Sequence, residues 1–200
     1  MEGAAAAVIK QRPDTNAVIR GASQDAPLLF YPSGMNNFSQ NHFSVIVKAP
    51  FGAIGIRSDS SALCEMVYLP PSYETQAPRD ALAEQAAGQL LRYLSDPGFH
   101  FTLPLATVGT AFQQKVWAAI AAIPCGAVLT YGDVARRVGS APRAVGQACG
   151  ANWFPLVIPC HRVTAAGGLG GFSHHDEIDG FHLGVKRWLL AHEGVKGFGR

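Results

Sequence analysis

The sequence has few cysteines, and they do not occur in pairs. Its four cysteines, Cys64, Cys125, Cys149 and Cys160, form no Cys-x-x-Cys pair and show no metal-ligand spacing. This pattern is typical neither of a disulfide framework nor of a zinc site built from cysteines. We therefore expect a reducing compartment, the cytoplasm or the nucleus, rather than secretion.

Long apolar stretches are also lacking. No run approaches the roughly 18 uninterrupted apolar residues of a transmembrane helix, so we expect no membrane association. The first 14 residues lack a basic start followed by a long apolar core, so we expect no secretory signal. Apolar residues make up 48% of the chain and charged residues 15%. This is the composition of a globular protein and excludes disorder of the chain as a whole.

Positive charge is modest, and it is unevenly distributed. The formal net charge of the whole chain is only +2. Residues 1–109 contain seven Lys/Arg and nine Asp/Glu, whereas residues 110–200 contain nine Lys/Arg and five Asp/Glu. The positive second half favours salt-sensitive contacts with a nucleic-acid backbone. A chance asymmetry of a solvated surface explains the same counts about as well.

Residues 41–104 have the pattern of a small α/β domain. Alternating apolar positions predict three strands, over residues 42–48, 53–57 and 62–69. Their short links favour an antiparallel meander. Leucine and alanine at intervals of four predict an amphipathic helix over residues 80–94, and residues 99–108 are expected to form an extended linker. Residues 1–40, which are rich in Ala, Gln, Asn, Ser and Pro, are expected to form a flexible arm.

Residues 105–200 are predicted to be mainly helical. Thr110 and Gln113 fit a capping box, which predicts that a helix begins there. Further helices are predicted over residues 132–138, 143–151 and 185–193. The short connection between the first two of these, after Gly139, indicates a helix-turn-helix, although many helical pairs share this pattern.

The segment Val157–Val163 (VIPCHRV) places a cysteine between a proline and a histidine. Pro159 restricts the backbone, so Cys160 is expected on a stiff, buried turn. A buried cysteine is inert unless a base activates it. His161 is the nearest base, but neighbours in an extended chain point to opposite sides, so we expect a bridging water between them. A carboxylate on the far imidazole nitrogen would strengthen the base, and Glu193 is the candidate.

An ordinary structural interpretation of the same residues stays open at this point. Cys160 and His161 can be core residues, and Glu193 a surface acid. For a generic Cys-His dipeptide this is the better interpretation. Only the other motifs of the chain favour a catalytic set over ordinary core residues.

Five segments resemble the O6-alkylguanine-DNA alkyltransferase family and follow one another in the family's order. They are Gly109–Trp117 (GTAFQQKVW), Leu129–Ala135 (LTYGDVA), Arg143–Gly146 (RAVG), Val157–Val163 and Trp188–Glu193 (WLLAHE). The match covers about residues 105–194, and IPCHRV is its most specific part. Residues 40–104 match only in their order of three strands and a helix. The resemblance implies an α+β fold. A small N-terminal antiparallel-sheet domain, ribonuclease H-like, would precede a C-terminal helical domain with a DNA-binding helix-turn-helix.

The resemblance implies a single-turnover repair protein that acts on double-stranded DNA. The alkyl group of O6-alkylguanine would move irreversibly to Cys160, with O4-alkylthymine as a further candidate substrate. His161 would deprotonate Cys160 through a water, Glu193 would orient His161, and Asn152 would buttress the site. A thioether has no hydrolytic exit, so no cofactor and no metal are expected. The protein is expected to act as a monomer.

The resemblance also implies how the base is reached. The residues implied to contact the extruded base are Tyr131, Ser173 and the backbone of Val163. A stacked guanine cannot reach a buried thiolate, so the nucleotide must leave the stack. Arg143 would fill the gap that it leaves. Ala144 and Gly146, small residues of the same helix, would let that helix approach the minor groove closely.

The chain departs from the family pattern after Ser173. Residues 174–182 (HHDEIDGFH) replace a much shorter link, and we expect a solvated loop beside the pocket mouth, with a metal site as the alternative. Trp153 stands where proline is common, and Cys149 where a larger apolar residue is frequent. Residues 1–105 contain no Cys/His set for the structural zinc ion of some family members.

Three other functions are weighed against this one. A damage sensor that binds lesions without transfer usually lacks the cysteine that this chain has. A helix-turn-helix regulator would leave the Cys-His-Glu set unexplained. A cysteine hydrolase would need an oxyanion hole, for which the sequence offers no candidate.

Overall fold

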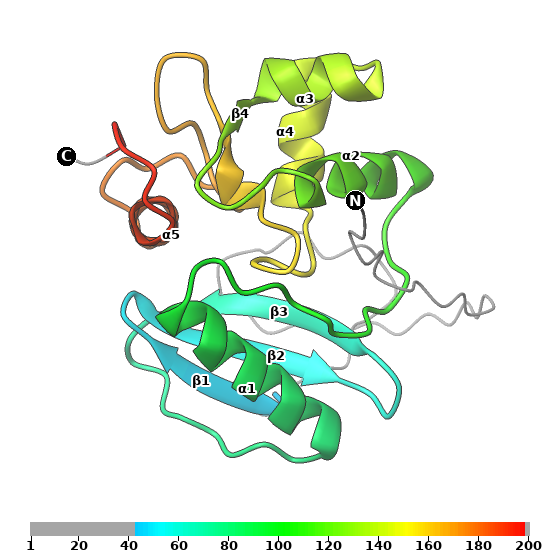
Figure 1. Ribbon diagram of the computed structural model, residues 1–200, viewed down its shortest axis with the longest axis vertical. Coiled ribbons are helices and arrows are strands. Elements are labelled where there is room, and N and C mark those ends of the chain that lie inside the picture. Colours follow the sequence, from blue (N-terminus) through cyan, green and yellow to red (C-terminus); the bar gives the residue numbers. More distant parts are fainter. Residues whose placement is uncertain (1–42, 199–200) are drawn as a thin grey trace, which may run out of the picture.

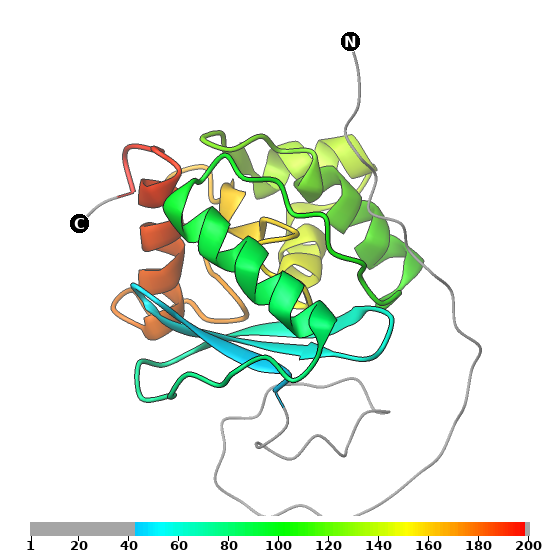
Figure 2. The same cartoon turned by 60° about the horizontal axis from the view of Figure 1, so that its bottom comes forward.

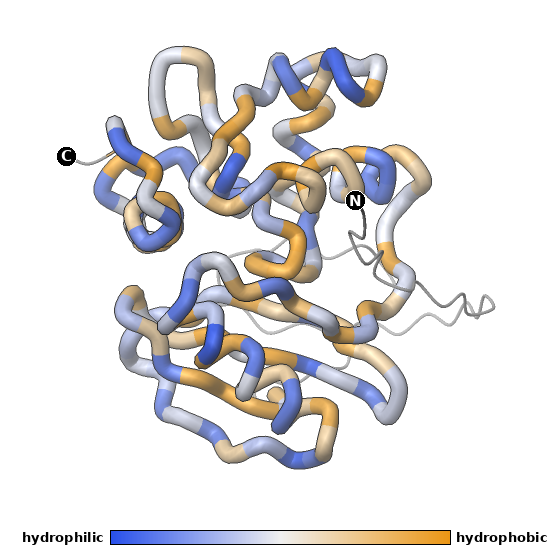
Figure 3. The backbone as a smooth tube through the Cα atoms, viewed as in Figure 1, coloured by the Kyte–Doolittle hydropathy of each residue, from blue (hydrophilic) through white to orange (hydrophobic). Residues whose placement is uncertain are grey.

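The computed structural model describes residues 43–198, so the arm expected over residues 1–40 lies outside the described residues (Figure 1). The N-terminal part is a three-stranded antiparallel sheet in the order β1-β2-β3. Its strands are β1 (Val45–Ala49), β2 (Gly52–Ser58) and β3 (Leu63–Leu69). The meander predicted from the alternating pattern is thereby confirmed. Figure 3 shows apolar segments along these strands.

Both faces of the sheet carry buried apolar residues. One face contributes Val47, Ile54, Met66 and Tyr68 to the main core, and the opposite face contributes Phe43, Ala53 and Leu69 to a smaller cluster. Helix α1 (Ala81–Ser95) lies across the sheet (Figure 2). It begins at the predicted place because the Asp80 side chain accepts a hydrogen bond from the backbone NH of Ala83.

The linker predicted over residues 99–108 is extended, and it runs beside the start of β3. The backbone NH of Leu63 donates to Pro104, and that of Ala106 donates to Leu63, both at 2.8 Å. The NH of Met66 donates to Trp153, also at 2.8 Å, so β3 is bonded directly to the C-terminal part of the chain. The main apolar core accordingly runs through both parts without a break.

Four helices form most of the C-terminal part. They are α2 (Ala111–Ala121), α3 (Tyr131–Val138), α4 (Pro142–Gly150) and α5 (Phe181–His192). The capping box of Thr110 and Gln113 is present, and Thr130 and Asp133 form a second one at α3. Gly139 ends α3 with a φ of 65°, a left-handed conformation that glycine adopts without strain. Among residues 43–198 no helix is long and apolar enough to span a bilayer.

The predicted start of the last helix was wrong, and three short elements were not predicted. Helix α5 begins at Phe181, not at residue 185, because Phe181 packs against the core and so extends the apolar face. Glu193 lies just beyond the helix as its C-cap. The missed elements are the parallel strands β4 (Leu129–Thr130) and β5 (Val163–Thr164) and the 3-10 turn η1 (Cys160–Arg162). Elements of two or three residues are too short to show a period.

Candidate active site

The cysteine of the VIPCHRV segment is held in the short turn η1. Cys160 is 4% exposed, and His161 is completely buried. The backbone NH of Cys160 donates to Ile158 and that of Arg162 to Pro159, at 2.8 and 2.9 Å. The backbone is therefore tightly turned at this point rather than extended, which corrects the premise that these neighbouring side chains point to opposite sides. Within residues 43–198 Nδ1 of His161 has no hydrogen-bond partner.

Asn152 braces the cysteine from the loop that follows α4. Its amide nitrogen donates to the carbonyl of Ile158 at 2.8 Å and to Sγ of Cys160 at 3.3 Å. Its side-chain oxygen accepts from the backbone NH of Phe154 at 3.0 Å. The same amide thus fixes the backbone ahead of the cysteine and also contacts the sulfur.

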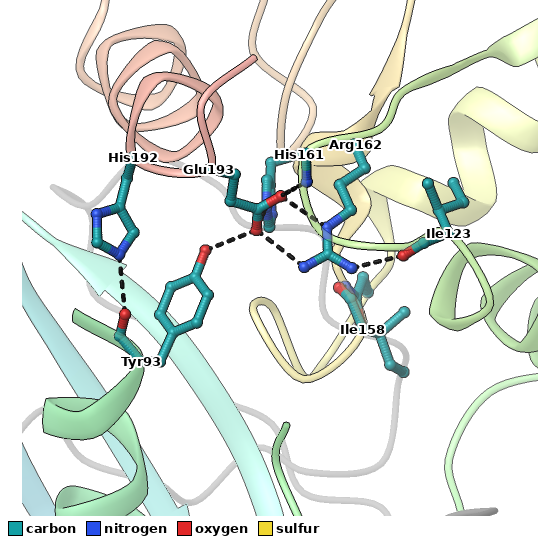
Figure 4. Close-up of polar contacts among 9 residues, drawn as sticks. Tyr93, Ile123, Ile158, His161, Arg162, His192 and Glu193 are labelled. Carbon is teal, nitrogen blue, oxygen red and sulfur yellow. Dashed lines mark hydrogen bonds and ion pairs between the residues drawn. The ribbon is translucent and has the colours of Figure 1, made fainter. Parts of the chain in front are cut away.

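A buried carboxylate, that of Glu193, contacts the imidazole of His161 (Figure 4). Its Oε1 is 2.8 Å from Nε2 of His161 and accepts from the Tyr93 hydroxyl at 2.9 Å. The guanidinium of Arg162 donates to both carboxylate oxygens, at 2.8 and 2.9 Å. Three side chains therefore converge on one acid, and this arrangement fixes the orientation of the imidazole.

The charges of this cluster follow from burial and hydrogen bonding. Burial alone would raise the pKa of Glu193, but the hydrogen bonds from His161 and Arg162 outweigh it, and the pKa of this carboxyl lies well below its usual range. Burial lowers the pKa of His161, which favours the neutral imidazole that a general base needs. Burial raises the pKa of Cys160. The hydrogen bond from Asn152 and the charge of Lys186 lower it, but by less. The thiol therefore needs an activating base.

Lys186 is a buried cation that sequence reasoning missed. Its ammonium group donates to the carbonyls of Val163, Leu169 and Gly171, at 2.7, 2.7 and 3.0 Å. Burial lowers its pKa to about 8, and negative charge on Cys160 or Cys149 would act in the opposite direction. Only its place within the mostly apolar face of α5 could have indicated that it is buried.

Cys160 lies at the wall of a cavity of about 400 Å³. Four of the residues that the resemblance implies at the base or the DNA also line it, namely Tyr131, Arg143, Gly146 and Ser173. The hydroxyl of Tyr131 donates to the carbonyl of Gly171 at 2.9 Å. Ala144 and Val163 are not part of this lining, and the carbonyl of Val163 already accepts from Lys186. The cavity thus brings together the thiol and most of the residues expected around it.

The extra segment after Ser173 lies beside this cavity, and His174, His175 and Asp176 line it. Phe172 and His175 exchange two backbone hydrogen bonds, at 2.7 and 2.9 Å, across a turn with φ values of 51° at Ser173 and 63° at His174. Residues 176–179 are exposed, as expected of a solvated loop. No group of three or more His, Cys, Asp or Glu residues in the described part of the chain could hold a metal ion.

Helix α4 presents small and basic residues next to the cavity. Arg143 is exposed, and Ala144 and Gly146 are half-buried. A Cβ atom at Gly146 would meet no atom nearer than the Tyr131 ring, at 4.0 Å. The absence of a side chain at position 146 is therefore not required by packing inside the protein.

Several known proteins are similar to this chain. The family described as 6-O-methylguanine DNA methyltransferase, DNA binding domain, matches residues 111–195. The regulatory protein ada of Salmonella typhimurium is 41% identical over 143 residues, which are 70% of this chain and 38% of that protein. The methylated-DNA--protein-cysteine methyltransferase of Methanosarcina mazei is 35% identical over 146 residues, 69% of this chain and 92% of that protein.

Solved structures similar to this one come from related proteins. The crystal structure of Mycobacterium tuberculosis OGT in complex with DNA matches with a TM-score of 0.62 at 34% identity, and the match covers 74% of this chain and 91% of that one. This chain spans less than two thirds of the length of several curated relatives, among them the Salmonella regulatory protein. Since it covers almost all of the Methanosarcina protein at 35% identity, the chain belongs to the methylated-DNA–protein-cysteine methyltransferase family.

Proposed function

We propose that this protein repairs DNA by direct reversal, moving the alkyl group of O6-alkylguanine irreversibly to its own Cys160. The observation that carries the proposal is the arrangement of three buried side chains. Cys160 lies at the cavity, His161 follows it in the same turn, and Glu193 holds the far nitrogen of His161 at 2.8 Å. Family membership supports the same chemistry.

The proposed reaction consumes one thiol per event. The Cys160 proton passes through a water to Nδ1 of His161, and Glu193 stabilises the imidazolium that forms. The sulfur then bonds to the alkyl carbon while the bond between this carbon and O6 breaks. The guanine keeps the electron pair and takes up one proton in place of the alkyl group. The thioether that remains on Cys160 has no leaving group, so the protein acts once and needs neither a cofactor nor a metal.

We propose that α3 and α4 act as a helix-turn-helix on double-stranded DNA, with α4 in the minor groove. Arg143, exposed at the first turn of α4, would fill the gap left by the flipped nucleotide. Extruding the base costs a few kcal/mol, which contacts in the cavity would offset. Tyr131, Ser173 and the backbone of Val163 are proposed to contact the base, and Ala144 and Gly146 to allow the close approach.

The remaining organisation is part of this proposal. Residues 41–104 would form an N-terminal domain of ribonuclease H-like type, and residues 105–200 the alkyltransferase domain. The protein would work as a monomer, since each proposed step uses groups of one chain. Its free cysteines favour a reducing compartment, the cytoplasm or nucleus. O4-alkylthymine is a further candidate substrate.

The test is transfer of a radiolabelled methyl group from duplex DNA that contains O6-methylguanine. We expect up to one label per chain, no further turnover, and no label on Cys160→Ala. Cys149→Ala is the matched control, because Cys149 is a second thiol at the same cavity, and it should still take up the label. DNA binding without labelling would instead favour a damage sensor or a regulator, and catalytic release of product a hydrolase.

A further inference from the structure

Four buried side-chain polar atoms lack a hydrogen-bond partner within residues 43–198, and two of them belong to residues beside the cavity that holds Cys160. These two are the hydroxyl of Tyr68 and Nδ1 of His161. Buried polar atoms in folded proteins are almost always bonded, to protein or to an ordered internal water. The mechanism proposed above uses Nδ1 of His161 but gives no role to Tyr68.

Tyr68 reaches this region from the sheet. It is 8% exposed, and its ring lies 5.5 Å from that of Phe172, which lines the same cavity as Cys160. The bond between Met66 and Trp153 holds this part of β3 against the loop from which Asn152 braces the thiol. Tyr68 itself does not line the cavity. The Tyr68 side chain therefore belongs to the protein interior beside the cavity, not to the surface that would face the DNA base.

The electrostatic surroundings connect Tyr68 to the same cluster. Burial raises the pKa of Tyr68 well above its ordinary value, and negative charge on Cys160, Tyr93 or Glu193 raises it further. The phenol consequently keeps its proton whenever Cys160 is a thiolate. A neutral phenol close to a forming anion is a hydrogen-bond donor.

We propose that Tyr68 is a positioning residue for the acceptor thiol, acting through the water between Cys160 and His161. Its hydroxyl would donate to this water before and after the proton moves. Before the step, the water accepts from the Cys160 thiol and donates to Nδ1 of His161. Afterwards it donates to the thiolate and accepts from Nδ1, and Tyr68 has neither gained nor lost a proton. The inference rests on the proposed function and adds a donor from the N-terminal part of the chain.

A purely structural role of Tyr68 would give a different result from the positioning role. If its hydroxyl is merely an unsatisfied group in an apolar core, its removal in Tyr68→Phe relieves a desolvation penalty. The variant would then be more stable and would react at the unchanged rate. If the hydroxyl bonds to the water, the same substitution slows the reaction and brings no gain in stability.

The experiment compares Tyr68→Phe with the wild-type protein in single-turnover methyl transfer across a pH series. Loss of one donor should slow transfer at neutral pH by roughly three- to tenfold. It should also raise the pH midpoint of the rate, because the thiolate is less stabilised. The midpoint of urea unfolding should not rise. Tyr73→Phe, a half-buried tyrosine of the smaller cluster, is the matched control and should change none of the three.

A second measurement does not depend on DNA. Alkylation of Cys160 by iodoacetamide, followed by peptide mass spectrometry, reports the thiolate directly, and Tyr68→Phe should raise its pH midpoint as well. An unchanged midpoint together with a more stable variant would overturn the role of Tyr68. A wild-type protein that alkylates with iodoacetamide but takes no label from DNA would instead overturn the proposed function.

Discussion

At the scale of single residues, Glu193 is the group on which the candidate site depends most. An acid at the C-terminal end of a helix faces the negative end of the helix dipole, which is unfavourable. Here the guanidinium of Arg162 and the hydroxyl of Tyr93 compensate for that position, and His161 shares the same carboxylate. The unfavourable position is tolerated because three donors surround it.

The low pKa of Glu193 predicts acid sensitivity of the fold. Since the folded-state pKa lies below the ordinary value of 4.5, its stabilising contribution is complete above about pH 4.5 and is lost as the pH falls towards the folded-state value. His161 acts in the same direction, because its lowered pKa means that only the unfolded state takes up a proton just below pH 6.5. Unfolding free energy measured by urea titration should therefore fall with acidification.

The matched variants for this prediction are Glu193→Gln and Glu177→Gln. Glu193→Gln should be less stable by roughly 3–5 kcal/mol near neutral pH, since Arg162 loses a buried partner, and should show a flatter profile in acid. Glu177→Gln, at an exposed position of the loop, should follow the wild-type profile. A Glu193→Gln profile as steep as that of the wild-type protein would contradict the assignment.

The sequence predicted those site residues that belong to motifs. Cys160, His161 and Glu193 lie in segments of the family pattern, and Asn152 lies in the matched stretch between two of those segments. In the structure Asn152 contacts Cys160, and Glu193 contacts His161. Tyr68 and Tyr93 lie in segments that match the family only in their order of elements. Each tyrosine stands where the pattern predicts an ordinary aromatic residue of the core. No local pattern in the sequence therefore shows that Tyr93 bonds to a distant carboxylate.

At the scale of elements, helix α4, the proposed docking helix, has a glycine that its own packing does not explain. A glycine inside a helix is less stable than alanine by roughly 0.5–1 kcal/mol. Gly146 has room for a Cβ atom, so the protein itself does not require glycine there. Its presence fits a helix that DNA must approach closely.

We therefore expect Gly146→Ala to have opposite effects on stability and binding. The variant should be more stable by roughly 0.5–1 kcal/mol in urea unfolding. It should also bind duplex DNA more weakly and repair it more slowly at limiting DNA. Gly88→Ala is the matched control, since this α1 glycine is equally unobstructed and lies in the N-terminal part; it should raise stability without affecting DNA binding. Equal DNA affinity of Gly146→Ala and the wild-type protein would argue against α4 as the docking helix.

The longer elements were predictable because their periods extend over several turns or pleats. The sheet, α1, α3 and α4 lie within a few residues of their predicted ranges, and α2 begins at the predicted capping box. The start of α5 was wrong because His182 and Gly184 interrupt the apolar spacing there, and the packing of Phe181 decides the boundary. The turn that holds Cys160 has three residues, and only its contacts with Asn152 and the following strand define it.

At the scale of the whole molecule, one core joins the two parts of the chain. The buried cluster runs from Val45 in the sheet to Leu189 in α5. Polar contacts add to it, since His192 lies 2.8 Å from the carbonyl of Tyr93 while the hydroxyl of Tyr93 bonds to Glu193. Neither part keeps a complete core without the other.

The described structure should accordingly unfold in one cooperative transition. The three tryptophans, Trp117, Trp153 and Trp188, all lie in the C-terminal part, and the ring of Trp188 also packs on Phe51. Their fluorescence therefore reports on that part and on its contact with the N-terminal part. Far-ultraviolet circular dichroism reports on the sheet and α1 as well. The two urea transitions should coincide, and separated midpoints would mean that the parts unfold independently.

The hydrogen bond from Tyr93 to Glu193 has a consequence for how this protein can be divided. The recognisable family segment covers residues 111–195 and includes the carboxylate, but the phenol that binds it comes from α1. A chimaera that transplants this segment onto a foreign N-terminal part would inherit the cysteine, the histidine and the acid without one of the acid's own ligands. The smallest transferable unit is therefore larger than the segment by which the family is recognised.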